Sequence, residues 1–163
     1  MNSLKYYKMK LSMTIRKALI SDAPAIAKLS CQLGYPTTTS QASLRLANLY
    51  NKKDQTVLVA DLEPQIVVGW IHIFGTQRVE TDPFAEIGGL VVDEAYRNHG
   101  VGKQLLEAAC LWAEDHGFRT VRVRSNIIRS DAHRFYQREG FQIAKTQVIF
   151  EINRHLTSRE IPD

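Results

Sequence analysis

The sequence predicts an α/β (α+β) fold in which a mixed, largely antiparallel central sheet is flanked by helices. Short runs rich in Val, Ile, Thr and Phe alternate along the chain with stretches whose apolar residues recur at helical spacing. In the middle, β-rich runs at 56–62 and 66–74 are separated only by Glu63, Pro64 and Gln65, which is typical of an antiparallel hairpin. Because two strands in succession have no helix between them, a purely parallel sheet is excluded.

Local signals justify the individual elements. Ser21 or Asp22 can cap the first helix, Pro24 is tolerated in its first turn, and Gly34 can end it. Ser40 is the cap candidate for the second helix. The expected order, β-α-α-β-β-β-α-β-α-β-β, runs over residues 15–19, 22–33, 40–50, 56–62, 66–74, 84–92, 100–116, 120–125, 130–139, 141–144 and 147–152.

Three further features concern this sheet. The polar stretch 75–83 is expected to form a loop. Gly88 and Gly89 interrupt the apolar run 84–92, and glycine inside a strand indicates a bulge or the close approach of a backbone or ligand. His72 alternates with two isoleucines, which is typical of a cross-strand residue.

Length and composition limit the function classes. With 163 residues, 44% of them hydrophobic, the chain fits one domain, expected at 13–152, with an N-terminal extension at 1–12 and a polar tail at 153–163. No apolar run approaches the roughly 20 residues of a membrane span. Cys31 and Cys110 lie in helix-like apolar surroundings and form no disulfide framework, which predicts reduced core residues and a cytoplasmic location. The histidines and cysteines lack ligand spacing, so no metal is expected.

The charge is mildly basic, with a net value of +4 and a pI near 9.1. Arginines crowd into residues 119–138, where apolar and acidic residues separate them. This pattern favours a local site for anionic groups, such as the phosphates of a small cofactor, over a solvated face or a nucleic-acid stripe.

The segment Arg97-Asn98-His99-Gly100-Val101-Gly102 joins an expected strand to a long helix. Its glycines permit a tight turn, and a helix N-terminus favours phosphate through its free N–H groups and its dipole. A Walker A loop is excluded because Gln104 follows Gly102-Lys103. A dinucleotide-binding loop is excluded because Leu105 stands where the third glycine is required. A ligand-free turn is the alternative.

The stretch from Leu90 to Gly102 resembles the cofactor motif of the GNAT superfamily of acetyl-CoA-dependent N-acyltransferases, Leu-x-Val, four residues, then Arg/Gln-x-x-Gly-x-Gly/Ala. The stretch from Ala132 to Phe141 resembles the second signature, Ala-x-x-Phe-Tyr-x-x-x-Gly-Phe. The likeness covers 13–152 in element order and 86–141 in motif. Glu94 and Arg129 depart from it, since the family often has Pro and Asn at these positions.

The resemblance implies an opening between the strand that ends at Val92 and the strand near 121–125. The pantetheine arm of acetyl-CoA would pair with the β edge at Leu90 and Val92, with Val92 N–H polarising the thioester carbonyl, and the pyrophosphate would bind the amides of 98–103. The cofactor-binding residues implied are Leu90, Val91, Val92, Arg97, Asn98, His99, Gly100, Val101, Gly102, Lys103, Asn126, Arg129, Ala132, Arg134 and Tyr136.

Two residues are candidates for proton transfer. Tyr136 matches the tyrosine that commonly protonates the departing thiolate in this family; alternatively it is a core aromatic beside Phe135. Glu86 is the candidate base, acting directly or through a water; alternatively it is a strand residue paired with an arginine. A water held by backbone carbonyls is the third candidate base.

The resemblance therefore implies an acyltransferase that moves the acetyl group of acetyl-CoA to a primary amine by direct attack in a ternary complex. The acceptor is a small molecule or a protein amine, with no nucleic-acid or membrane partner, and both a monomer and a homodimer are open. Two alternatives are an aminoglycoside-type amine acetyltransferase and a non-catalytic acyl-CoA-binding regulatory module.

Overall fold

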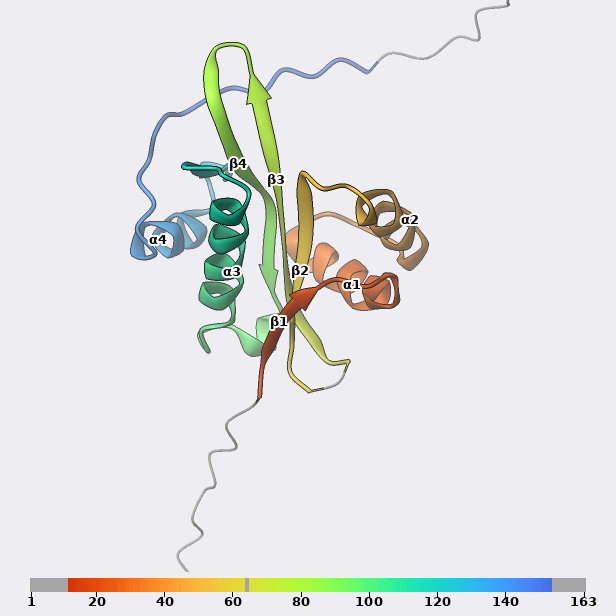
Figure 1. The fold of residues 1–163 in the computed structure, drawn as a ribbon. Helices are drawn as coiled ribbons and strands as arrows, with labels where there is room; N and C mark the ends of the chain where they lie inside the picture. Colours follow the sequence, from red (N-terminus) through yellow and green to blue (C-terminus); the bar gives the residue numbers. More distant parts are fainter. Residues whose placement is uncertain (1–11, 64, 154–163) are drawn as a thin grey trace, which may run out of the picture. The chain divides into compact units, whose positions relative to one another are not determined.

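The computed structural model describes residues 12–63 and 65–153 (Figure 1). The predicted N-terminal extension, except for residue 12, and the polar tail, except for residue 153, lie outside these residues. The chain divides into two compact units, one up to Asn126 and one from Ile127 onward. Each unit is described separately below.

The first unit contains a five-stranded sheet of order β1-β2-β3-β4-β5. The first four strands pair antiparallel and β5 pairs parallel with β4, so the predicted mixed, largely antiparallel sheet is confirmed. The strands are β1 (Thr14–Lys17), β2 (Gln55–Asp61), β3 (Val67–Arg78), β4 (Thr81–Val92) and β5 (Val121–Val123).

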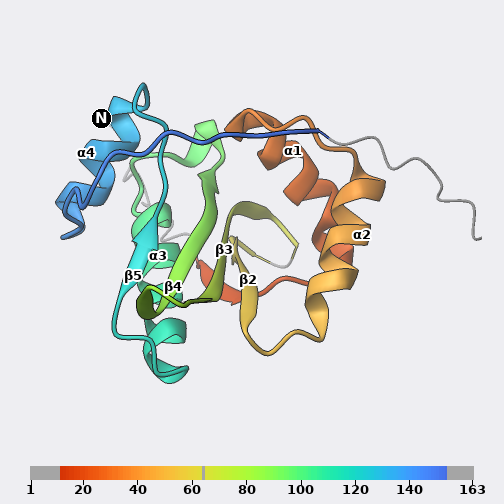
Figure 2. The same cartoon turned by 90° about the horizontal axis from the view of Figure 1, so that it is seen from above.

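Helices cover both faces of this sheet (Figures 1 and 2). Helices α1 (Ala23–Leu33) and α2 (Thr39–Tyr50) pack on one face, and α3 (Val101–Asp115) packs on the other. Because side chains alternate along a strand, His72 and Gln55 lie on the α1/α2 face, whereas Gly69 lies under the α3 residues Val101 and Leu105.

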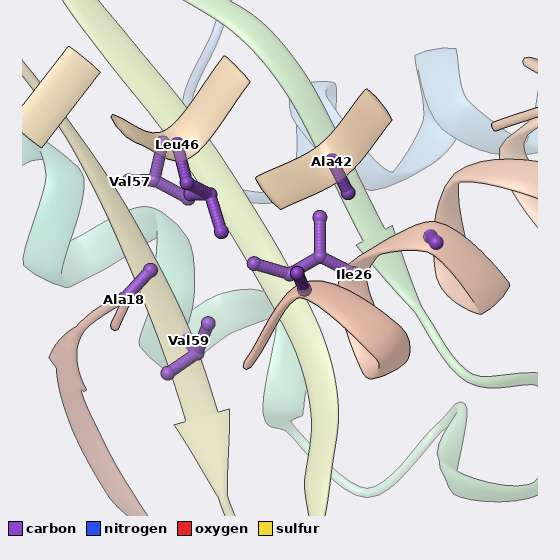
Figure 3. Close-up of a cluster of buried hydrophobic side chains, with 8 residues drawn as sticks. Ala18, Ile26, Ala42, Leu46, Val57 and Val59 are labelled. Carbon is purple, nitrogen blue, oxygen red and sulfur yellow. The ribbon is translucent and has the colours of Figure 1, made fainter. Parts of the chain in front are cut away.

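The core beneath α1 and α2 is built from small and branched side chains that the helical and strand periods bring together (Figure 3). Ile26 of α1 and Leu46 of α2 meet Val57 and Val59 of β2, and Val59 is fully buried. Burying an aliphatic side chain of this size stabilises a fold by about 1.5–3 kcal/mol. This core fixes the α1/α2 layer beside the inner strands.

Strand β1 is held in place by an arginine that lies between two buried carboxylates. Arg16 of β1 donates to Asp22 from both Nη atoms, at 2.8 and 2.9 Å, and to Asp61 of β2 from Nε at 2.9 Å. Leu19 N–H also donates to Asp22 at 2.7 Å, which turns the chain into the short helix η1 (Ile20–Asp22). The first strand therefore ends at Lys17 instead of Leu19 as predicted.

Most helix boundaries are confirmed. Pro24 lies in the first turn of α1 and Gly34 ends it with a φ of 99°. The predicted cap of α2 is wrong, because Thr38 is the capping residue instead of Ser40. The Thr38 hydroxyl accepts from Gln41 N–H, and the Gln41 side chain accepts from Thr38 N–H, a reciprocal pair that Ser40 cannot form.

The predicted loop at 75–83 is wrong, because β3 and β4 continue through it as a hairpin joined at Val79 and Glu80. The hairpin extends beyond the helices (Figure 1), and its end at residues 77–80 is exposed to solvent, which favours polar side chains there. The polar composition predicted a loop. The two strands nevertheless pair, because their hydrogen bonds join backbone groups and do not depend on side-chain polarity.

The second unit contains α4 (Ser130–Arg138), as predicted. The closing strands expected at 141–144 and 147–152 are absent from the described residues, which carry no regular element from Phe141 to Asn153. Their apolar side chains are mostly exposed, reaching 91% for Phe150. Alternating apolar residues can form one face of a strand. A strand also needs a neighbouring strand that pairs with its N–H and C=O groups, and the regular element in the described part of this unit is a helix.

Both cysteines are free thiols, but Cys31 is exposed and not a core residue. Within the described residues, no helix is long and apolar enough to cross a membrane.

Candidate acetyl-CoA site and acceptor face

A bulge in β4 reverses the direction of its backbone groups. Ala85 N–H donates to Thr120 C=O on the β5 side, at 2.9 Å, whereas Asp93 N–H donates to Val68 C=O on the β3 side, at 2.8 Å. In a regular strand, residues an even number apart point to the same edge, so one residue is inserted between these two. The register identifies it as Gly88, which confirms the predicted bulge.

Beyond the bulge, β4 has an edge along which no other strand of the described residues pairs, called the free edge of β4 below. The N–H groups of successive residues in a strand point to opposite edges, and that of Asp93 points to β3. The N–H groups of Val92 and Leu90 therefore point away from β3. The pairing with β5 ends at Ile87 and Val123, so these two groups face the side where β4 has lost its neighbour. Val92 C=O faces the same side and accepts from Arg97 Nε at 3.2 Å. The edge can accept an extended polar chain such as pantetheine.

Gly88 and Gly89 cannot carry a side chain without disturbance, because aromatic rings on β3 lie against the bulge. A Cβ atom on Gly88 would lie 2.9 Å from Phe74 Cε1 and 3.2 Å from His72 Nδ1, and one on Gly89 would lie 2.8 Å from the Trp70 ring. Contacts this short require the rings to move. Gly88 and Gly89 therefore let three side chains of the α1/α2 face lie directly on the bulge.

The loop that follows β4 leads into an uncapped helix. After η2 (Glu94–Tyr96), Asn98 and Gly100 adopt positive φ values of 63° and 80°, and Gly100 is the N-cap of α3 without a side-chain hydrogen bond. The first amide of the hydrogen-bonded helix is that of Gln104, which donates to Gly100 C=O at 3.1 Å. The amides of Val101, Gly102 and Lys103 precede it and are available to an anion.

The side chains of this loop leave its backbone accessible. Arg97 lies 3.9 Å from Glu94, His99 Nδ1 contacts Arg97 C=O at 2.7 Å, and Lys103 lies 3.9 Å from Glu107. The structure thus brings Arg97 to Leu90–Val92 at the β4 edge and places the 98–103 amides after it. Asn98 supplies a left-handed turn residue that the sequence analysis did not identify, although Asn is the residue type that tolerates this conformation best after glycine.

Glu86 lies on the α1/α2 face of β4, two residues before the bulge, with only 8% of its surface exposed. Arg124 binds it at two points, from Nε to Oε1 at 3.0 Å and from Nη2 to Oε2 at 3.3 Å. The arginine pairing considered for Glu86 is therefore present, though the carboxylate is buried and not on the surface. Nothing in the sequence marks Arg124 as the partner of Glu86.

Arg122, the register partner of Glu86 on β5, stacks on Phe84 with its guanidinium 3.9 Å from the ring centre. Stacking of this kind holds a cation in place. The face around Glu86 therefore combines a buried carboxylate with two ordered guanidinium groups.

In the second unit, Tyr136 lies on α4 and contacts Phe135 and Phe141, with ring centres 5.2 and 5.6 Å apart. Burial raises the pKa of Tyr136 to about 12, while the charge of Arg129 acts in the opposite direction. The phenol is therefore protonated at neutral pH and can donate a proton. Both the predicted acid and the core-aromatic interpretation agree with this environment.

The remaining predicted cofactor residues lie near the start of α4. Asn126 follows β5, Arg129 is the N-cap residue, and Ala132 and Arg134 lie on α4, where Arg134 pairs with Asp131. In the described residues, His, Cys, Asp and Glu form no cluster that could hold a metal ion.

Residues 53–143 match the acetyltransferase (GNAT) domain family. This match covers more than half of the chain, so the chain belongs to the GNAT acetyltransferase family, a family of acyltransferases.

Two curated relatives share shorter segments. The uncharacterized N-acetyltransferase YhdJ of Bacillus subtilis (strain 168) is 43% identical over 58 residues, which is 35% of this chain and 41% of that protein. The aminoalkylphosphonate N-acetyltransferase of Salmonella typhimurium (strain LT2) is 44% identical over 57 residues, 35% of this chain and 37% of the relative. The chain thus spans about two fifths of each.

Solved structures share the fold at low identity. The aminoglycoside antibiotic 6'-N-acetyltransferase AAC(6')-Ih from Acinetobacter baumannii superposes with a TM-score of 0.77 at 20% identity, covering 88% of this chain and 100% of that one. A transcriptional regulator from Bacillus halodurans C-125 gives a TM-score of 0.77 at 22% identity, covering 86% and 100%. AAC(6')-Iy, in complex with a CoA-linked bisubstrate analog, gives 0.76 at 20% identity, covering 88% and 99%.

Proposed function

We propose that this protein transfers the acetyl group of acetyl-CoA to a primary amine by direct attack in a ternary complex. The observation that carries the proposal is the free edge of β4, which leads through a left-handed turn at Asn98 and Gly100 to the uncapped start of α3. An edge suited to an extended amide chain, followed by a cluster of free N–H groups, matches the sequence of pantetheine and pyrophosphate in coenzyme A.

In this proposal different groups of the protein bind the different parts of acetyl-CoA and act on the reacting atoms. The amides of Leu90 and Val92 bind the pantetheine arm, Val92 N–H polarises the thioester carbonyl, and the amides of 98–103 hold the pyrophosphate. Arg97, Asn126, Arg129, Ala132 and Arg134 are the further cofactor contacts. The amine nitrogen forms a bond to the carbonyl carbon as the C–S bond breaks, a general base takes the proton that the nitrogen loses, and Tyr136 gives its proton to the thiolate.

Glu86 is assigned to the acceptor. A buried carboxylate on the α1/α2 face can bind the acceptor as an ammonium ion before it reacts. Arg124 is 54% exposed on its side chain, so an incoming cation can replace it without leaving the carboxylate unpaired.

The proposed acceptor is a primary amine. The aminoalkylphosphonates and aminoglycosides named for the relative and the structural neighbours both carry amines. We also propose a cytoplasmic location, supported by the free cysteines, with a small-molecule or protein amine as partner.

The experiment that tests the binding site uses Gly102→Glu, which places a side chain and a negative charge where the phosphates bind. In the parent, acetyl-CoA at about 100 times its Kd should stabilise the fold by about 2.7 kcal/mol, and the variant should lose this thermal shift. Leu111→Glu is the matched control, because it adds the same charge to an exposed position further along α3. A full shift in Gly102→Glu disproves the site.

A panel of primary amines with acetyl-CoA, followed by thiol release, tests the reaction itself. Release that depends on both substrates supports a transferase. Saturable acetyl-CoA binding without thiol release from any amine favours the non-catalytic module.

The role of Tyr136 is tested by Tyr136→Phe. Loss of a general acid lowers turnover about 10²- to 10⁴-fold while cofactor affinity stays constant, because the phenol acts only as the thiolate leaves. Tyr50→Phe, at an exposed position on α2, is the control. Turnover of Tyr136→Phe within about twofold of the parent means that the phenol serves packing alone.

A further inference from the structure

His72 lies on the α1/α2 face of β3, directly opposite Gly89 of the bulge. Its Nε2 is 3.0 Å from the side-chain oxygen Oε1 of Gln55, on the neighbouring strand β2. Because a carboxamide oxygen accepts, Nε2 must carry the proton in this arrangement, which leaves the lone pair of the neutral ring on Nδ1.

The unprotonated nitrogen faces the bulge. A Cβ atom on Gly88 would come within 3.2 Å of Nδ1, so the missing side chain of Gly88 leaves room at this nitrogen. Among the described residues, the side-chain atoms that are buried without a partner are Trp70 Nε1 and Thr81 Oγ1. Nδ1 of His72 has no hydrogen-bond partner among the described residues and is not one of these two atoms, so it is not completely buried.

The surroundings of His72 favour the neutral ring. Burial lowers the pKa of His72 below its ordinary value, and no charged group contributes to the shift. The neighbouring strand β2 presents the neutral Gln55, and β4 presents Gly88 and Gly89, with Glu86 further along β4 bound by Arg124. Phe74 lies beside the ring, 5.3 Å between centres. The imidazole is thus free to accept a proton at neutral pH.

We propose that Nδ1 of His72 is the general base that removes a proton from the acceptor ammonium, directly or through one water. This inference rests on the proposed acetyl transfer and identifies the base of that reaction. The ammonium loses one proton to Nδ1, and the neutral amine then forms a bond to the carbonyl carbon as the C–S bond breaks. Tyr136 gives its phenol proton to the thiolate and is reprotonated by the second amine proton, which leaves the amide and the free thiol. The imidazolium then releases its proton to solvent.

His72 suits this task better than Glu86. In the protein without substrate, both oxygens of Glu86 accept from Arg124, whereas Nδ1 of His72 has no hydrogen-bond partner among the described residues. Burial lowers the pKa of His72, which keeps its ring neutral at neutral pH with the lone pair of Nδ1 available to a proton. Glu86 keeps the role of binding the ammonium.

The test compares His72→Gln and Gln55→Glu with the parent. Glutamine can keep the contact to Gln55 but has no base at the Nδ1 position, so kcat/KM should fall about 10²- to 10⁴-fold. The acidic limb of the pH profile, where kcat/KM rises as His72 loses its proton, should disappear. Gln55→Glu places a carboxylate on Nε2, which favours the imidazolium, and should move the same limb to higher pH.

The acetyl-CoA thermal shift serves as the folding control, because His72 does not contact the cofactor loop. A parent-like shift combined with an unchanged rate and limb in His72→Gln overturns the inference. If His72→Gln fails to fold, Gln55→Glu decides, and a limb that stays in place in that variant overturns it. The proposed function fails in a different way, through the absence of thiol release by the parent with every amine, and the assignment of His72 then falls with it.

Discussion

Arg16 and Arg124 both bind a buried carboxylate in the unit up to Asn126, but they differ in their own exposure to solvent and in the number of carboxylates that they bind. Arg16 is 29% exposed and connects Asp22 to Asp61, two carboxylates from different elements. Arg124 is 54% exposed and has the single partner Glu86. Removing Arg16 leaves two buried charges uncompensated, whereas Arg124 can be replaced at its carboxylate by another cation. The first cluster therefore stabilises the fold, and the second is suited to exchange with a substrate.

The largest effect is expected for Arg16→Met. Removing the cation of a buried ion pair lowers the free energy of unfolding by about 3–5 kcal/mol. Lys17→Met is the matched control on the same strand; it loses a 3.3 Å bond to Tyr50 C=O and should cost under about 1 kcal/mol. Urea unfolding measures both. Equal losses in the two variants contradict the special role of Arg16.

Glu86→Gln should affect activity more than stability. A charged hydrogen bond to the acceptor contributes about 1.5–3 kcal/mol, so kcat/KM for the amine should fall about 10- to 100-fold, most strongly at low pH, with acetyl-CoA binding unchanged. Glu80→Gln, at an exposed carboxylate of the same hairpin, is the control. An unchanged acceptor KM and pH profile means that Glu86 serves the fold alone.

The pH dependence of stability distinguishes the clusters further. Burial raises the pKa of Asp22, but the hydrogen bonds from Arg16 and Leu19 and the charge of Arg16 outweigh it, so the pKa is lowered overall. The stabilisation is complete above the ordinary value near 3.9 and is lost as pH falls through the lower folded value. For one proton, the slope is at most about 1.4 kcal/mol per pH unit.

In Arg16→Met, Asp22 loses the hydrogen bonds and the charge of Arg16 that lower its pKa, so it gains more from protonation than in the parent. The stability difference between parent and variant should therefore shrink as the pH falls from about 5 to about 3. Unfolding curves recorded across this range provide the measurement. A difference that is constant with pH would show that Arg16 acts through packing of its aliphatic stem.

The smallest effect is expected for Arg124→Gln. Arg124→Gln should cost less stability than Arg16→Met, because it leaves one buried carboxylate without its cation instead of two and because Arg124 itself is 54% exposed. If an incoming ammonium replaces Arg124, the variant should bind the acceptor at least as tightly as the parent, which steady-state KM and direct binding can measure. A stability loss as large as that of Arg16→Met would remove the distinction between the clusters.

The parts of the site that depend on neighbours in sequence were predicted well. The turn at Gly100, the start of α3 and the bulge at Gly88 each follow from a glycine and the few residues around it. Conformation at such positions is decided by local steric freedom, so a motif of six residues carries the information.

The parts that depend on register were not predicted. The pairing of Arg124 with Glu86 joins residues 38 positions apart, and the contact of His72 with Gln55 joins residues 17 apart. A shift of one residue in either strand pair would turn these side chains to the opposite face. The sequence identified Glu86 as a candidate acid, but its environment depends on this alignment.

The family motifs, the helix boundaries and the mixed sheet were determined by the sequence itself, because caps, glycines and apolar periods act over a few residues. Only the tertiary structure decided that residues 75–83 extend a hairpin and that 141–152 form no strand. Both outcomes depend on whether another strand lies alongside to satisfy the backbone N–H and C=O groups, and a run of side chains does not encode the presence of that neighbour.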